Sequence, residues 1–368
     1  MKTIKYLSTM LLLVASVSLA SCAKSPAPTV PSTPQAPATS PAERQAKLVE
    51  GATKEGKLVI WTYNMRKKEN VLAPFVAKYP GITVDVWDSR GAEIVAKLVE
   101  ERKVGRYTPD VLILTTEMAE VQEMGALEEY EWPNAQGWAS QPNHNFYRNV
   151  WGNTRIIPYN TKNVAPADVP KIWDDLKSTK WAGRTAMSTS GEDTTLFWAY
   201  LWRVGDTLNW EKSEAFWGEV IKNVKPRVES GFTGPNELLS AGDFDILMPS
   251  ASSSTITLMR KGANIDIAPL KEGTQEPASM ALMKNAPHPN AARLFLDLYT
   301  TADALAIYID DLNALPFPGG AVPMEKTYAG KKVADLGMKL QVIPPGITTN
   351  TANLKRASDF WQKALGVK

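Results

Sequence analysis

Hydroxyl side chains gather at two points where a predicted strand gives way to a predicted helix. Ser188, Thr189 and Ser190 form the first group, and Ser250, Ser252, Ser253 and Ser254 form the second. The amino end of a helix carries unpaired N–H groups and a partial positive charge, so it readily binds an anion. Serine and threonine are also ordinary helix caps. Because one cap per helix leaves several hydroxyls over, we expect an anion to contact at least one of the two groups.

A second set of polar residues follows the strands predicted in the first part of the chain. It comprises the cations Arg66, Lys67 and Arg90, together with Tyr63, Asn64, Ser89, Thr116 and Glu117. Arginine and lysine usually lie at solvated surfaces. Open α/β sheets, however, bind ligands at the carboxyl ends of their strands, which is where these residues fall. We therefore expect them to face the serine groups across a ligand cleft.

The single cysteine, Cys22, ends a segment typical of an exported lipoprotein. Residues 1–22 have lysines near the start, then a short apolar stretch, then Leu19-Ala20-Ser21-Cys22, which resembles the bacterial lipobox. The apolar stretch is too short for a membrane-spanning helix. The resemblance implies cleavage before Cys22 and attachment of acyl chains such as palmitate, which would hold the protein on a lipid bilayer. The alternative is an ordinary buried cysteine beside a chance run of small residues.

Residues 23–42 are rich in proline, alanine, serine and threonine. Such a segment cannot build a core and is expected to be an extended, disordered linker. At roughly 3 Å per residue it could hold a folded domain up to about 60 Å from the bilayer. The sequence thus predicts a tethered, exported globular protein.

Beyond the linker, apolar runs of strand length alternate with helical periodicity. Strands are expected near residues 57–63, 82–87, 110–115, 185–188, 244–248 and 265–268, and helices near residues 42–54, 71–76, 94–99, 194–202, 216–224, 254–261, 294–299 and 354–365. This alternation predicts an α/β fold with mainly parallel sheets flanked by helices. The length suits two lobes of comparable size.

Seven short segments together resemble the extracellular solute-binding proteins of bacterial ABC importers, and in particular their ferric-iron type. The segments lie at residues 56–62, 75–84, 109–112, 158–161, 173–176, 180–184 and 286–292. The resemblance implies a two-lobed type 2 periplasmic-binding-protein fold. One lobe would comprise residues 43–155 and 280–368, and the other residues 156–279. Crossovers near Tyr159 and residues 273–276 would form the hinge, and the ligand would lie between the lobes.

The resemblance does not carry over the ferric-iron site itself. Members of the ferric type use a neighbouring tyrosine pair, whose place falls on Ser253 and Ser254 here, and Lys67 falls where a histidine sometimes lies. Ferric iron prefers hard anionic oxygens, which serine supplies poorly, and Glu117 alone would not hold the metal. We therefore expect a small anionic organic solute, such as a phosphorylated, phosphonate or carboxylate compound. Ferric iron or a metal chelate remains the alternative.

Composition narrows the function further. The 41 basic and 39 acidic residues argue against nucleic-acid binding, and one cysteine and two distant histidines leave no zinc pattern and little general-base capacity. We expect no cofactor and no catalytic residues, with an ABC permease as the partner and a location on the cell envelope, in a host with either one or two membranes. A ligand-presenting sensor lipoprotein or an exported hydrolase are the alternatives from other classes.

Overall fold

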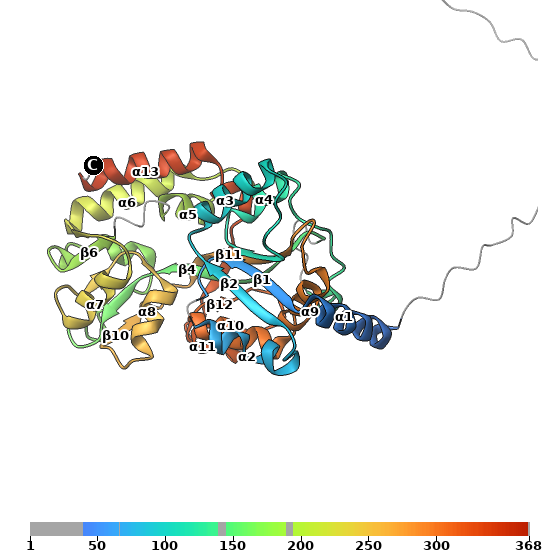
Figure 1. Cartoon of the computed structure of the whole chain (residues 1–368). Coiled ribbons are helices and arrows are strands. Elements are labelled where there is room, and N and C mark those ends of the chain that lie inside the picture. Colours follow the sequence, from blue (N-terminus) through green and yellow to red (C-terminus); the bar gives the residue numbers. More distant parts are fainter. Residues whose placement is uncertain (1–39, 66, 139–144, 189–193, 367–368) are drawn as a thin grey trace, which may run out of the picture. The chain divides into compact units, whose positions relative to one another are not determined.

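The computed structural model describes residues 40–65, 67–138, 145–188 and 194–366 (Figure 1). Arg66, Thr189, Ser190 and Cys22 therefore lie outside the described residues. The strands are β1 Lys57–Thr62, β2 Thr83–Asp88, β3 Val111–Leu114, β4 Tyr147–Ile156, β5 Pro158–Asn160, β6 Thr185–Ser188, β7 Arg227–Glu229, β8 Ile246–Leu247, β9 Ser250–Ala251, β10 Ile265–Ile267, β11 Glu272–Leu282, β12 Leu315–Pro316 and β13 Lys339–Val342.

Helices cover both sheets. They are α1 Pro41–Glu55, α2 Lys68–Lys78, α3 Gly91–Lys103, α4 Met118–Glu123, α5 Thr194–Leu201, α6 Trp210–Val224, α7 Thr233–Ala241, α8 Ser252–Met259, α9 Pro289–Tyr299, α10 Ala302–Leu312, α11 Tyr328–Asp335, α12 Pro345–Thr348 and α13 Thr351–Leu365. Short 3-10 turns lie at Pro133–Ala135, Trp173–Lys177, Thr179–Trp181 and Met324–Lys326.

The first sheet runs in the order β12-β4-β11-β3-β1-β2, with β13 beside β11 and β9 beside β4. β1 pairs in parallel with β2 and β3, whereas β11 pairs antiparallel with β3 and β4. The carboxyl ends of β1, β2 and β3 therefore meet at one edge, as the alternation of strands and helices predicts. Of the two longest strands, β11 runs against that direction and β4 runs with it, so the sheet is mixed.

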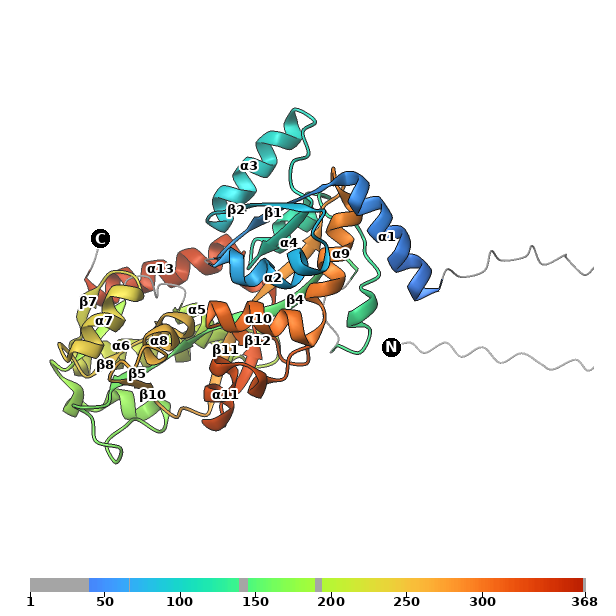
Figure 2. The ribbon, with the colours of Figure 1, turned by 60° about the horizontal axis from the view of Figure 1, so that its bottom comes forward.

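The second sheet runs in the order β10-β5-β8-β6-β7. β6 pairs in parallel with β7 and β8, and the β5 pairs are antiparallel. Its core contains a tryptophan cluster in which Trp198 contacts Trp173 and Trp217, each in an edge-to-face arrangement. In Figures 1 and 2, β4 leads from the first sheet towards the elements of the second.

The division of the chain between the sheets differs in two places from the ranges expected. β11 begins at Glu272, so residues 272–279 pair within the first sheet, although the sequence assigned them to the second lobe. α13 was assigned to the first lobe, but its buried Ala357 and Trp361 belong to the core of the second sheet. Figure 1 shows α13 lying along α6 and α5. The reason is packing: the buried face of α13 fits the same tryptophan cluster, because Trp361 contacts Trp217 edge to face.

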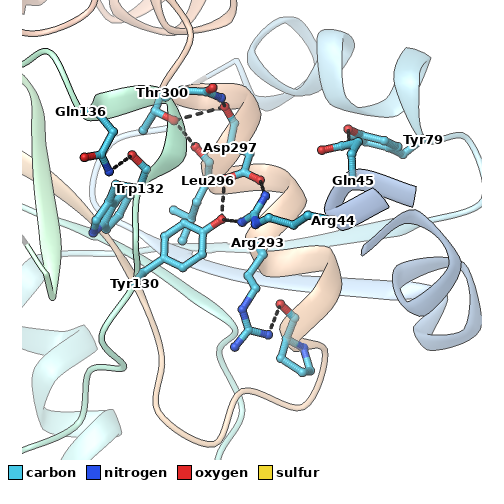
Figure 3. Close-up of polar contacts among 12 residues, drawn as sticks. Arg44, Gln45, Tyr79, Tyr130, Trp132, Gln136, Arg293, Leu296, Asp297 and Thr300 are labelled. Carbon is cyan, nitrogen blue, oxygen red and sulfur yellow. Dashed lines mark hydrogen bonds and ion pairs between the residues drawn. The ribbon is translucent and has the colours of Figure 1, made fainter. Parts of the chain in front are cut away.

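The helix that follows the proline-rich segment is fastened by a polar cluster (Figure 3). Arg44 of α1 donates to the carboxylate of Asp297 on α9 at 2.6 Å and to the hydroxyl of Tyr130 at 2.6 Å. The Tyr130 hydroxyl also donates to Asp297. α1 lies beside α9 in both ribbon views, so the start of the folded part is attached by charge as well as by apolar packing.

Candidate functional site

The ends of β1 and β2 bring four of the expected site residues together. Tyr63, Asn64, Ser89 and Arg90 line a pocket of about 360 Å³ with Asp88 and Glu93. The carboxylate of Asp88 accepts the backbone N–H groups of Asn64 at 2.9 Å and Met65 at 2.8 Å, which fixes the turn after β1. The expectation that parallel strand ends gather polar side chains is met at this edge.

Arg90 already has a carboxylate partner on its own helix. Its guanidinium Nε donates to Glu93 at 2.9 Å, and the Ser89 hydroxyl donates to the same carboxylate. The Glu93 pKa is lowered by the hydrogen bond from Ser89 first and then by that from Arg90. The side chain of Arg90 is 82% exposed, so its charge is balanced at the surface instead of projecting unpaired into a cleft.

Glu117 lies over the amino end of α3. A Cβ placed on Gly91, the first residue of α3, would come within 2.1 Å of a Glu117 carboxylate oxygen, so a larger residue there would displace the Glu117 carboxylate. The Thr115 hydroxyl donates to Glu117 at 3.0 Å. A carboxylate at a helix amino end is favourable for the helix dipole. Thr116 is half-buried beside it.

The serines of the two predicted strand-to-helix groups separate into two kinds. Three are buried and bonded inside the protein: the Ser188 hydroxyl donates to the Gly231 carbonyl, the Ser250 hydroxyl accepts from Asn236, and the Ser252 hydroxyl accepts from the Thr154 N–H. Ser253 and Ser254, in the first turn of α8, are half-buried, and neither hydroxyl is hydrogen-bonded to a residue that the structure describes. The surplus of hydroxyls that favours an anion at this helix end therefore reduces to these two.

A larger pocket, of about 480 Å³, opens where α2 and α10 of the first sheet approach α8. Its lining residues are Lys67, Asn70, Thr257, Arg260, Lys261, Ile307, Asp310, Asp311 and Asn313. Only Lys67 among them was expected from the sequence. The others lie on helices whose approach is set by tertiary packing, and no local pattern marks them.

Polar contacts tie α8 to α10 along one wall of this pocket. Arg260 donates to the Asp310 carboxylate at 2.8 Å and to the Asn313 side chain at 2.9 Å. Asn313 in turn donates to the Thr257 hydroxyl at 3.0 Å. Lys67 reaches Asp311 at 3.6 Å, whereas Lys261 forms no ion pair within the described part of the chain. The pocket thus has two lysines, and Lys261, which follows α8, has no ion-pair partner among the described residues.

Two comparisons bear on this arrangement. A family model of bacterial extracellular solute-binding proteins matches residues 67–311, which is most of the folded part of the chain. The chain belongs to this family. A comparison with curated proteins finds no match.

Solved structures share the fold of this solute-binding protein. Iron-bound HitA from Pseudomonas aeruginosa has a TM-score of 0.63 and 15% identity, over 84% of this chain and 99% of that one. A Trichodesmium protein, IdiA or FutA, in complex with iron and citrate has a TM-score of 0.64 and 16% identity, over 85% and 100%. AfuA from Actinobacillus pleuropneumoniae, bound to fructose-6-phosphate, has a TM-score of 0.58 and 16% identity, over 85% and 99%. The two-lobed fold expected from the sequence is thereby confirmed.

The crossing strands of the solute-binding protein hold polar residues that the sequence reasoning missed. The Ser279 hydroxyl of β11 donates to Asn149 of β4 at 2.6 Å, and the buried guanidinium of Arg155 lies 5.0 Å from the Phe197 ring and 5.2 Å from the Phe232 ring. A buried, ring-stacked arginine on a strand that links two sheets is a strong candidate for a site residue. The only sequence feature that could have pointed to Arg155 is its place at the start of residues 155–161, a short segment of extended character.

The described residues contain neither a metal-ligand cluster nor a membrane-spanning helix. Among them, no group of three or more histidine, cysteine, aspartate or glutamate side chains could hold a metal ion. In the same part of the chain, no helix has the length and apolar character needed to cross a membrane.

Proposed function

We propose that this protein captures a small anionic organic solute, such as a phosphorylated, phosphonate or carboxylate compound, and delivers it to an ABC permease. The observation that carries the proposal is the pocket between α2, α10 and α8, to which Lys67 contributes from one side and Lys261 from the other. Ser253 and Ser254 lie in the first turn of α8 and offer hydroxyl donors at its amino end, whereas Lys261 follows the carboxyl end of the same helix.

Capture would proceed by closure of two lobes around the solute. The lobes would comprise about 43–155 with 280–340, and about 156–271 with 343–365, and β4 and β11 would cross between them. A solute that contacts both sides of the pocket favours the closed state, because it binds that state more tightly than the open one. The hydrogen bonds and ion pair between Arg260 and Asp310 of α10 would hold one end of α8 in place while the rest of the helix moves.

A thermal-shift screen of phosphorylated, phosphonate, carboxylate and neutral compounds tests this proposal. A solute at a hundredfold its Kd adds about 2.7 kcal/mol to the free energy of unfolding, so anions should stand out. Lys261→Gln should then weaken the best anion by roughly 1.5 kcal/mol, and Ser253→Ala by about 1 kcal/mol. Lys363→Gln, which removes an exposed lysine of α13, is the matched control. Hits confined to neutral sugars or amines would contradict the proposal.

Ferric iron or a metal chelate is the second candidate, and it is favoured by one specific observation. Glu117 presents a half-buried carboxylate at an edge where Tyr63 also lies, so one acid and one phenol come from neighbouring strand ends. HitA and the Trichodesmium protein have this fold and bind iron. An iron titration that follows visible absorbance separates the candidates, because phenolate ligands give a charge-transfer band.

The amino-terminal segment would give the protein its address. We propose that residues 1–22 are removed and that Cys22 is acylated, so that residues 23–42 tether the folded part to a lipid bilayer. The solute-binding protein would then work at the cell envelope: on the periplasmic face of a membrane, or on the outer face of the cytoplasmic membrane in a single-membrane host. Membrane fractionation of a Cys22→Ser variant tests this assignment.

A further inference from the structure

Asp311 is a buried carboxylate whose hydrogen-bonding capacity is only partly used. Its side chain is 9% exposed, and its Oδ2 atom is buried without a hydrogen-bond partner in the described part of the chain. Its Oδ1 atom has two distant neighbours, Asn70 Nδ2 at 3.4 Å and Lys67 Nζ at 3.6 Å. A buried acceptor that lacks a partner costs free energy, so such an atom in a native structure calls for an explanation.

The surroundings of Asp311 favour a positive group. Asp311 is the penultimate residue of α10, and the last residues of α8 face the same pocket, so two helix carboxyl ends converge there. Helix carboxyl ends carry partial negative charge and attract cations. The nearest arginine does not meet this demand, because Arg260 is bonded to Asp310 and Asn313. The Lys67 side chain is 62% exposed, and its Nζ atom lies 3.6 Å from Oδ1 of Asp311, which is too far for a good hydrogen bond.

We propose that the solute carries an ammonium group that pairs with Asp311, which makes it a zwitterion. Its anionic end would lie towards Lys261 and its ammonium end against the Asp311 carboxylate, since both side chains line one pocket of about 480 Å³. The inference rests on the proposed capture of an anionic solute and adds the second charge. A metal ion fits less well, since no cluster of three anionic or imidazole ligands occurs among the described residues.

The enclosed oxygen can be brought into reach by a small motion. The χ2 torsion of aspartate is broad and roughly two-fold, so the carboxylate can turn at low cost. The contacts given up by Oδ1 are both longer than a good hydrogen bond. An ammonium group offers three donors and would satisfy both oxygens.

The test uses matched compounds that differ only in the ammonium group: ethyl phosphate against phosphoethanolamine, and propionate against β-alanine. Calorimetry with the full mature chain should show the ammonium member of the binding pair to be about tenfold tighter. Asp311→Asn should abolish that difference between the two members of the pair. Asp303→Asn, an exposed aspartate at the start of the same helix, is the control and should keep the preference.

Three outcomes decide the matter. If both members of each pair bind equally to the parent protein, or if the preference survives in Asp311→Asn, the ammonium site is wrong and the anionic function stands. If neither member binds, both proposals fall.

Asp311→Asn should also raise the melting temperature of the unliganded protein, because an unsatisfied buried charge is removed. Asp311→Ser provides a second variant should the first fail to fold.

Discussion

Removing the guanidinium of Arg44 should lower the free energy of unfolding, because this group fastens α1 to α9. In Arg44→Met, the Asp297 carboxylate, which is 10% exposed, loses its cationic partner, and Tyr130 loses a hydrogen-bond donor. Breaking a fully buried pair costs about 3–5 kcal/mol, because the remaining charge is left uncompensated. Since Arg44 is itself 28% exposed, water can reach part of the pair. We therefore expect a loss of about 2 kcal/mol in the free energy of unfolding.

Urea unfolding at neutral pH, followed by tryptophan fluorescence of the Cys22→Ser chain, measures this loss. Lys47→Met removes an exposed positive charge from the same helix and should change the free energy of unfolding by less than about 0.5 kcal/mol. Tyr130→Phe should cost about 1 kcal/mol. The double variant should fall short of the sum, because the two side chains share Asp297. Equal free energies of unfolding for Arg44→Met and Lys47→Met would refute the stabilising role of the cluster formed by Arg44, Tyr130 and Asp297.

Four further outcomes follow from the sequence and structure. Cys22→Ser should move the protein from the membrane fraction to the soluble fraction, and sedimentation with membranes after a high-salt wash would contradict the lipoprotein assignment. Ferric salts should produce no phenolate charge-transfer band, whereas a strong band would restore an iron site. Arg260→Met should lower the free energy of unfolding by about 1 kcal/mol at low salt and by less in 1 M salt, since the pair with Asp310 is partly exposed. Burial raises the Tyr299 pKa, so above pH 10 the unfolded phenol loses its proton while the folded one keeps it; stability should fall there, and Tyr299→Phe should reduce the slope.

Strong local patterns made much of the fold predictable. β6 occupies the residues expected, and β1, β2, β3 and β10 differ from expectation by a residue or so at their ends, because apolar runs bounded by turn residues are clear signals. β4 and β11 were largely missed. Both mix polar and apolar residues although nearly every position is buried, so no two-residue alternation is visible. One pair of their polar residues, Asn149 and Ser279, is hydrogen-bonded across the two strands, and that pairing is invisible before folding.

The candidate site was predictable only in part. Tyr63, Asn64, Ser89 and Arg90 do meet at strand ends, as the topology rule requires. The rule cannot say which hydroxyls are hydrogen-bonded inside the protein. Ser250 and Ser252 are buried and accept hydrogen bonds from Asn236 and from the Thr154 N–H. Nor can it locate Asp311, which lies far along the chain on a helix that reaches the pocket through packing against α2.

The two ends of the folded chain are attached to different sheets, and this has a practical use. α1 is fastened to α9 by Arg44, while α13 is buried in the tryptophan cluster through Trp361. A fluorescent donor placed just before Pro41 and an acceptor placed just after Leu365 would each follow one lobe. Under the proposed closure, energy transfer between such reporters would record solute capture directly, without an insertion in any internal loop, which is the design of a genetically encoded sensor.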